Sequence, residues 1–112
     1  MKKIEAIIRP EKLTVVRKAL EEIGATGITI TEVKGHGAQR GVVQQWRGNT
    51  YTVDLLNKVK LDVVVQDELL ERALQAIHET ARTGEIGDGK VFVSEIIDVM
   101  RVRTGERGKV AV

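Results

Sequence analysis

Hydrophobic and polar positions alternate along the chain in four separate stretches. Ile4, Ala6 and Ile8 share one face of an extended segment, and residues 59–66 repeat this alternation. Residues 28–33 and 91–99 are rich in β-branched residues. Because side chains of a strand point alternately to opposite faces, this pattern predicts four strands, at residues 2–9, 28–33, 59–66 and 91–99.

Apolar residues recur at helical spacing after the first and after the third predicted strand. This spacing predicts amphipathic helices over residues 11–23 and 67–82. Gly24 is predicted to end the first helix, whereas Asp67 is predicted to cap the second and Gly84 to end it. The apolar faces consist of Leu13, Val16, Leu20 and Ile23 in the first helix and of Leu70, Ala73, Leu74, Ile77 and Ala81 in the second.

The order strand, helix, strand therefore occurs twice in 112 residues. Two such halves in one short chain predict an α+β fold of the ferredoxin-like split β-α-β type. In that fold, a four-stranded antiparallel sheet carries two helices on one face. We expect a single domain over residues 1–112, with a long loop projecting from it.

That projecting loop, residues 36–57, is too long for an ordinary connection within a compact domain. Residues 42–46 and 50–55 have strand-like composition around the sequence Arg47-Gly48-Asn49, so we predict a hairpin and a mobile arm that a ligand or partner orders. Two of the three aromatic residues, Trp46 and Tyr51, fall in this arm. They favour partner contact or covalent modification, although packing of the hairpin against itself is the alternative.

Composition and charge narrow the possible functions. Cysteine is absent and there are only two histidines, which excludes thiol catalysis, disulfides and cysteine- or histidine-rich metal sites. The net charge of +2 is segregated, because residues 34–60 carry +4 and residues 101–109 carry +3, whereas residues 61–100 carry −6. Segregated positive charge favours an anion site, with chance clustering on solvated faces as the alternative. The apolar stretch near residue 1 is too short for a signal peptide, so we expect a cytoplasmic protein.

Three segments are candidates for anion contact. Residues 83–90 place three glycines and Lys90 between a helix and a strand, where bare backbone amides can hold an anion; a helix stop followed by a turn is the alternative. Arg101 and Arg103 would share one face of an extended segment, or simply protect a strand edge. Gly35-His36-Gly37 allows close approach of a ligand or serves as a hinge.

Neither histidine suggests catalysis. His78 is expected near the polar side of the second helix, in a structural or solvated role. The acidic residues form no pattern of a catalytic triad or of paired carboxylates, so we expect no enzyme. A phosphotransfer enzyme would need a positioned base and a metal-holding carboxylate beyond Asp88. An RNA-binding module would need aromatic residues on the central strands, and only Phe92 lies on a predicted strand.

Three motifs occur in the order and spacing of one known family. They are Trp46-Arg47-Gly48-Asn49-Thr50-Tyr51, the segment Thr83–Val93 with the sequence TGEIGDGKVFV, and Arg101-Val102-Arg103-Thr104-Gly105-Glu106. With these motifs the chain resembles the PII nitrogen-regulatory signal proteins over residues 1–109.

The resemblance implies a homotrimeric signal protein that binds ATP or ADP between subunits and, with Mg-ATP, also 2-oxoglutarate. It implies that the following residues bind the nucleotide: Ile7, Thr29, Gly35, Gly37, Asp62, Val64, Gly87, Asp88, Gly89, Lys90, Arg101 and Arg103. For 2-oxoglutarate it implies the residues Gln39, Gly41, Lys58 and Gly87, and it makes Gln39 the ligand of Mg²⁺. A protein with this binding pattern that had lost the 2-oxoglutarate response would sense only the adenylate ratio.

The resemblance also assigns roles to the projecting arm and to the end of the chain. The arm, about residues 36–56, matches the T-loop, in which Tyr51 matches a position of nucleotidylation and Trp46 and Arg47 would contact partners. Implied partners are an ammonium transporter, which would give peripheral membrane association, and glutamine synthetase, N-acetylglutamate kinase or a nucleotidylyltransferase, but no nucleic acid. Residues 83–90 match the phosphate-binding loop, and residues 100–112 form the C-terminal segment. Ala38 stands where many relatives carry arginine, and Asp62 where glutamate is usual.

Overall fold

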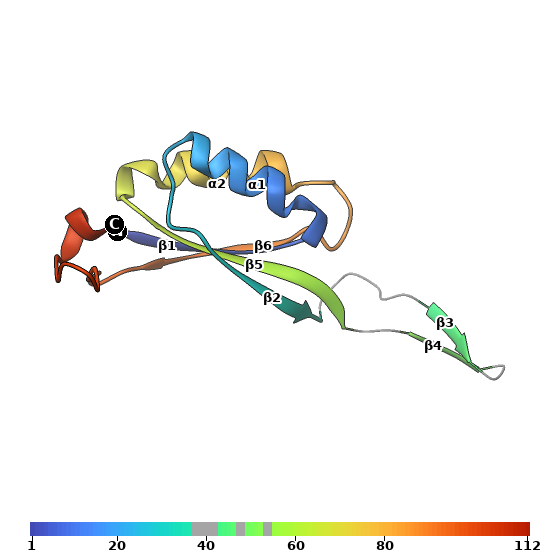
Figure 1. Cartoon of the computed structure of the whole chain (residues 1–112). Coiled ribbons are helices and arrows are strands. Elements are labelled where there is room, and N and C mark those ends of the chain that lie inside the picture. Colours follow the sequence, from blue (N-terminus) through green and yellow to red (C-terminus); the bar gives the residue numbers. More distant parts are fainter. Residues whose placement is uncertain (37–42, 47–48, 53–54) are drawn as a thin grey trace.

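The computed structural model describes residues 1–36, 43–46, 49–52 and 55–112. Four strands form one antiparallel sheet with the order β2-β5-β1-β6, as Figure 1 shows. Their bounds are β1 Lys2–Ile8, β2 Thr29–Gly35, β5 Leu56–Val65 and β6 Gly89–Glu95. This order confirms the predicted ferredoxin-like split β-α-β arrangement, because each half contributes one central and one edge strand.

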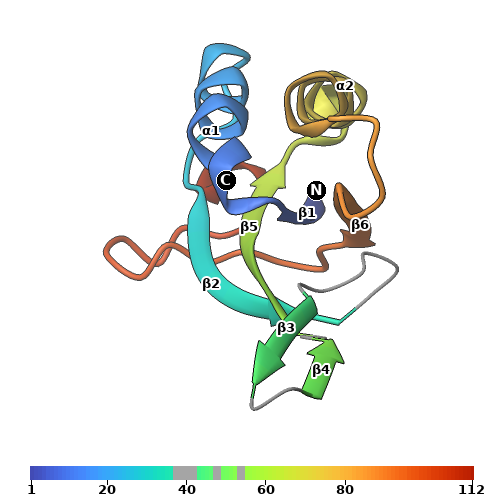
Figure 2. The ribbon, with the colours of Figure 1, turned by 90° about the vertical axis from the view of Figure 1, so that its right-hand side faces the viewer.

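Two helices, α1 (Leu13–Glu22) and α2 (Leu70–Ala81), lie side by side on one face of this sheet and leave its other face uncovered (Figure 2). Each begins with a 3₁₀ turn, Pro10–Lys12 before α1 and Asp67–Leu69 before α2, where the sequence predicted continuous helix. The apolar faces are those predicted. A further 3₁₀ turn, Gly108–Ala111, lies near residue 112.

The hydrophobic core lies between the two helices and the two central strands. The edge strands β2 and β6 contribute no fully buried residue, because each has a neighbour on one side only and the helices sit over the centre of the sheet. The buried core residues are Ile4, Ala6, Ile8, Val16, Leu20, Ala25, Val59, Leu61, Val63, Val65, Ala73, Ile77 and Ala81.

Two of the three predicted helix-boundary signals are wrong. Gly24 does end α1, with a positive φ of 91° and a hydrogen bond from its amide to the Glu21 carbonyl. Asp67, however, forms no cap; its carboxylate accepts instead from the amino group of Met1 at 2.8 Å. Helix α2 ends before Gly84, since Arg82 is already extended and Gly84 belongs to the turn that follows.

The fourth strand is shorter than predicted. It ends at Glu95, and residues 96–99 continue outside the sheet, with Ile96 donating its amide to the carbonyl of Met1. Residues 102–104 form a turn, closed by a hydrogen bond from the amide of Gly105 to the carbonyl of Arg101. The predicted extended segment carrying Arg101 and Arg103 on one face is therefore wrong, because the chain reverses there.

The projecting hairpin is confirmed where the structure describes it. Strands β3 (Val43–Trp46) and β4 (Asn49–Thr52) pair antiparallel, beyond the end of the main sheet in Figure 1. Asn49 pairs with Trp46 and so belongs to a strand, not to the turn that the sequence predicted. The predicted mobility of this arm is not tested by these strands. Within the described part of the chain, no helix is long and apolar enough to span a membrane.

Candidate functional site

The segment between α2 and β6, residues 82–88, is organised around one carboxylate. Asp88 Oδ2 accepts the amides of Thr83 and Gly84, each at 2.9 Å, and Asp88 Oδ1 accepts the Thr83 hydroxyl and the Arg9 guanidinium. The hydrogen bond from the Thr83 hydroxyl, followed by those from the two amides and Arg9, holds the pKa of Asp88 far below its usual range. Asp88 is therefore an anion at any physiological pH.

Arg9 reaches this segment from the end of strand β1. Its Nε lies 3.0 Å from Asp88 Oδ1, and its Nη2 lies 3.0 Å from the carbonyl oxygen of Ile86. The Arg9 side chain is only 16% exposed, so solvent screens its ion pair with Asp88 less than it screens a surface pair. Sequence reasoning missed this residue; the available signal was a cation placed directly between an apolar strand and Pro10.

Gly89 joins this segment to strand β6 in very close contact with β1. It has a φ of 103°, and a Cβ at this position would lie 1.8 Å from the carbonyl oxygen of Ile7. No other residue fits both the conformation and the space. The next residue, Lys90, is in register with Ile7, which brings these two predicted nucleotide contacts together.

Lys58 approaches the same segment from strand β5. Its Nζ donates to the carbonyl oxygen of Gly87 at 2.5 Å, so the predicted 2-oxoglutarate residues Lys58 and Gly87 are in contact. Burial lowers the pKa of Lys58, and the positive charge of Arg9 lowers it further. A lysine held in this way gives up its proton more easily than an exposed lysine.

The uncovered face of the sheet carries the other predicted nucleotide residues. Thr29 and Asp62 are directly opposite each other on β2 and β5, and Ile7 and Val64 share their face by the strand registers. Asp62 Oδ1 is buried without a hydrogen-bond partner, and the nearest cation is Lys3 at 3.8 Å. A buried carboxylate oxygen in this condition is suited to accept a donor from a ligand.

Lys60 lies on the same face, between two acidic residues. Its Nζ lies 3.6 Å from Glu5 and 3.9 Å from Asp62, so charges of opposite sign alternate across β1 and β5. Gly35, at the end of β2, lies against Lys58, whose Cγ would be 3.0 Å from a Cβ at that position. Gly35 thus gives Lys58 room to turn toward residues 86–88.

The structure separates two predicted groups within one chain. Gly89 starts strand β6, whereas Arg101 and Arg103 follow its far end, and in Figure 1 the segment after β6 lies at the opposite end of the sheet from the loop between α2 and β6. Arg101 is engaged there by Glu106 at 3.3 Å. The predicted ligands Gly37, Gln39 and Gly41 and the predicted partner residue Arg47 lie outside the described residues. Trp46 and Tyr51 lie on β3 and β4.

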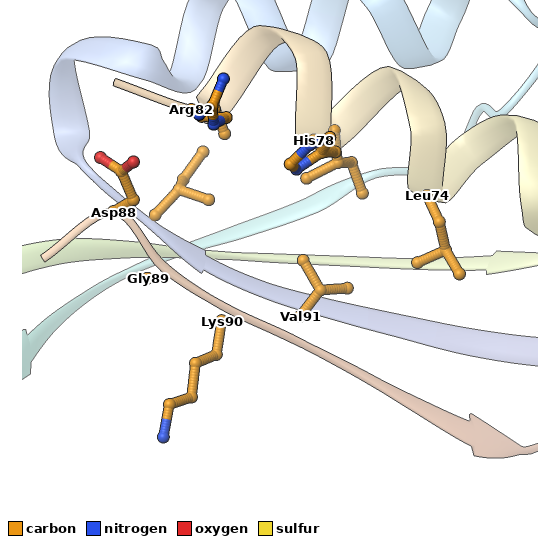
Figure 3. A pocket seen from close by; sticks show the side chains of 10 residues that line it. Leu74, His78, Arg82, Asp88, Gly89, Lys90 and Val91 are labelled. Atoms are coloured by element: carbon orange, nitrogen blue, oxygen red, sulfur yellow. The ribbon is translucent and has the colours of Figure 1, made fainter. Parts of the chain in front are cut away.

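A cavity of about 430 Å³ lies between α2 and β6, on the helix side of the sheet, and its lining includes Asp88, Gly89 and Lys90 of the candidate site (Figure 3). Leu74 and Val91 line it, with the exposed residues His78 and Arg82 on its helix side. The Lys90 side chain points away from α2 in Figure 3. His78 is exposed on α2, as the sequence predicted.

Comparisons with known proteins agree with the resemblance found in the motifs. The sequence model of the family "Nitrogen regulatory protein P-II" matches residues 1–106. A nitrogen regulatory protein P-II of Azospirillum brasilense is 56% identical over 108 residues, which cover 96% of each chain. One of Mesorhizobium japonicum is 56% identical over the full length of both chains. A nitrogen regulatory protein P-II 1 of Methanothermobacter thermautotrophicus is 55% identical over all 112 residues, 97% of that relative.

Proposed function

The chain belongs to the nitrogen regulatory protein P-II family, and from this premise we propose that it senses ATP or ADP together with 2-oxoglutarate. The observation that carries the proposal is the convergence of Lys58, Gly87 and Lys90 at one end of the sheet, beside Ile7. Backbone amides and a lysine suit the phosphates of a nucleotide. A second lysine, in contact with the same segment, suits a dicarboxylate.

The nucleotide is proposed to bind against the uncovered sheet face and residues 87–90. Asp62 supplies an unused acceptor for a base amino group, and Thr29 and Val64 extend the same face. Mg²⁺ enters with ATP, whose phosphates are its main ligands, and Gln39 is the proposed protein ligand. The described residues contain no cluster of three or more acidic, histidine or cysteine side chains that could hold a metal by itself.

The proposed assembly is a homotrimer, which completes each nucleotide site. In the proposed trimer a second copy supplies Arg101 and Arg103, because strand β6 separates them from residues 87–90 of their own chain. The same C-terminal segment exposes large apolar side chains, with Ile97 98% and Val102 92% accessible. Exposed apolar surface of this kind is typical of an unfilled protein interface.

The proposed output is the conformation of the arm, residues 36–56. Strands β2 and β5 lead into it from either side, and Lys58 lies near its second attachment, two residues beyond the start of β5. Mg-ATP with 2-oxoglutarate would retract the arm, whereas ADP or ATP alone would leave it extended to dock on a partner. Proposed partners are an ammonium transporter, nitrogen-assimilation enzymes such as glutamine synthetase or N-acetylglutamate kinase, and a nucleotidylyltransferase acting on Tyr51.

Calorimetric titration of 2-oxoglutarate in the presence of Mg-ATP, and then of ADP, tests the proposal. We expect binding only with Mg-ATP, because the two proposed sites share Gly87, and this coupling must be reciprocal. Equal affinity with and without ATP would contradict the coupling. Binding of ATP and ADP without any response to 2-oxoglutarate would instead identify a sensor of the adenylate ratio, and would make Ala38 the first position to restore to arginine.

The pH dependence of the same titration tests the role of Lys58. The pKa of Lys58 is lowered from 10.5, so the amine loses its proton at a lower pH than an ordinary lysine. The neutral amine cannot pair with a carboxylate, so 2-oxoglutarate affinity should fall as the pH rises through this lowered pKa. The Lys58→Arg variant stays charged, so its affinity for 2-oxoglutarate should not change over the same pH range. A wild-type affinity that stays constant up to pH 10.5 would exclude Lys58 as the ligand.

A further inference from the structure

Arg9 is attached to the segment 82–88 at two points, through two different guanidinium nitrogens. One nitrogen donates to the Asp88 carboxylate and the other to the Ile86 carbonyl, each over 3.0 Å. The planar guanidinium makes both hydrogen bonds in one fixed orientation, which a lysine ammonium does not reproduce. Arg9 therefore fixes the position of the segment relative to strand β1.

Asp88 has little capacity left for a ligand. Four donors occupy its two oxygens, and they come from the backbone of Thr83 and Gly84, the Thr83 hydroxyl and Arg9. A carboxylate also repels a polyphosphate, so an anion here has to be bound by groups other than Asp88. The neighbouring glycines and Lys90 are such groups.

We infer that Arg9 and Asp88 are positioning residues, which hold residues 83–89 in the conformation that receives phosphate, and that the Asp88 carboxylate does not contact the nucleotide. This inference rests on the proposed function and names the residues that shape its site. Arg9 then has two effects. It anchors the segment, and it neutralises the negative charge of Asp88 beside the phosphates.

The same pair connects the two proposed ligand sites. Ile86 and Asp88, which Arg9 holds, flank Gly87, whose carbonyl oxygen receives Lys58 Nζ at 2.5 Å. The charge of Arg9 also acts on the Lys58 ammonium. Displacement of residues 86–88 would therefore move the contact of Lys58 as well as the amides near the phosphates. Loss of Arg9 should weaken the binding of both ligands, although it touches neither.

Arg9→Gln tests the inference, with Mg-ATP as the calorimetric probe and amide hydrogen exchange as a second readout. We expect Mg-ATP affinity to fall about tenfold or more, the effect of losing a hydrogen bond between charged groups. Exchange at the amides of Thr83 and Gly84 should become faster, because their acceptor is no longer fixed. Arg17→Gln is the matched control: Arg17 pairs with Glu21 on the exposed face of α1, and both readouts should stay at wild-type values.

Asp88→Asn separates positioning from contact. If Asp88 positions the segment, the variant should bind Mg-ATP more weakly, because an amide cannot accept at both of its polar atoms. If Asp88 faced the phosphates directly, removal of its charge would leave the affinity equal or raise it, which would overturn the inference. The double variant should lose no more affinity than the weaker-binding single variant, and additive losses would also overturn it.

Two further outcomes are informative. If Arg9→Gln does not fold, Arg9→Lys keeps the charge and loses one of the two anchoring hydrogen bonds; wild-type affinity and exchange in that variant would contradict the inference. If the wild-type protein binds no Mg-ATP, the proposed function fails, whereas amide exchange still decides whether Arg9 and Asp88 hold the segment.

Discussion

Two segments flank strand β6, and they differ in how many of their polar and apolar groups find partners within one chain. In residues 82–88, before the strand, Asp88 accepts the amides of Thr83 and Gly84, and Arg9 and Lys58 hold the segment from the sheet. Residues 96–107, after the strand, contain the turn at residues 102–104 and expose Met100, Val102 and, almost completely, Ile97.

The difference separates what the folding of one chain achieves from what the proposed assembly adds. Residues 82–88 have their shape within one chain, so little ordering cost remains for the proposed binding of a phosphate. Residues 96–107 carry exposed apolar area whose burial is favourable only in contact with another surface. Each of the following predictions tests one side of this comparison.

The largest effect is expected for Gly89→Ala. The new Cβ would lie 1.8 Å from the Ile7 carbonyl at a φ of 103°, so β6 or β1 has to move, and we expect a loss of more than about 3 kcal/mol in the free energy of unfolding. Gly105→Ala is the matched control, because its φ is 76° but nothing lies within 4 Å; it should cost about 1 kcal/mol. Chemical denaturation of both variants measures the difference, and equal losses would contradict the account of Gly89.

The next effect concerns assembly. Ile97→Asp combined with Val102→Asp puts two charges on the exposed C-terminal segment, and we expect the sedimenting mass to fall from that of the proposed trimer to that of one chain. The secondary structure of the single chain should persist, because neither side chain contributes to the core. Val15→Asp, at an exposed position on helix α1, is the control and should leave the mass unchanged. A trimer that survives the double substitution would contradict the proposed interface.

Acid titration should distinguish the two segments by a smaller effect. The pKa values of Asp88 and Asp98 are both lowered, Asp98 chiefly by its hydrogen bond from Arg107. Each contributes stability that is present above the ordinary carboxyl pKa and is lost as the pH falls through the lowered value. Because the pKa of Asp88 is lowered far more, the Asp98–Arg107 pair should break first. Carboxyl carbon shifts measured by NMR would show the order, and the reverse order would contradict it.

The smallest effect is expected for Glu106→Gln. Glu106 pairs with Arg101 over 3.3 Å at the surface, where solvent screens the charges, so stability should change by less than about 0.5 kcal/mol. Thermal unfolding of the variant beside the wild-type protein measures this change. A larger loss would mean that this pair supports the C-terminal segment as Asp88 supports residues 82–88.

Sequence patterns were sufficient to predict the elements in which buried and exposed residues alternate regularly. The alternation in β1 and β5 and the helical spacing in α1 and α2 match the core, because these four elements enclose it. The end of β6 was not predictable, since Ile96, Ile97 and Val99 continue a β-branched pattern beyond the strand, where Ile97 is exposed and Ile96 and Val99 are half-buried. Local apolar pattern does not distinguish side chains that pack within a chain from side chains left open to another surface.

The candidate site was predictable only where glycines and cations follow one another in sequence. Residues 83–90 could be identified in this way, whereas Arg9 lies 79 residues from Asp88 and has no neighbouring motif. Its role depends on the antiparallel register that brings Gly89 opposite Ile8, which is a property of the assembled sheet. The prediction that Asp67 caps the second helix was wrong for a similar reason. Its carboxylate accepts a hydrogen bond from the amino group of Met1, 66 residues away.

Strand β5 has a mechanical consequence that follows from its length. Its residues from Val59 to Asp62 are paired with both β1 and β2, whereas Leu56, Asn57 and Lys58 are paired with β2 only and extend beyond the end of β1. We expect this two-stranded end of the sheet to bend most easily where β1 ends, next to Lys58. A force on the β3–β4 hairpin and a ligand bound at Lys58 would therefore act on the same short segment, residues 56–58, from its two ends.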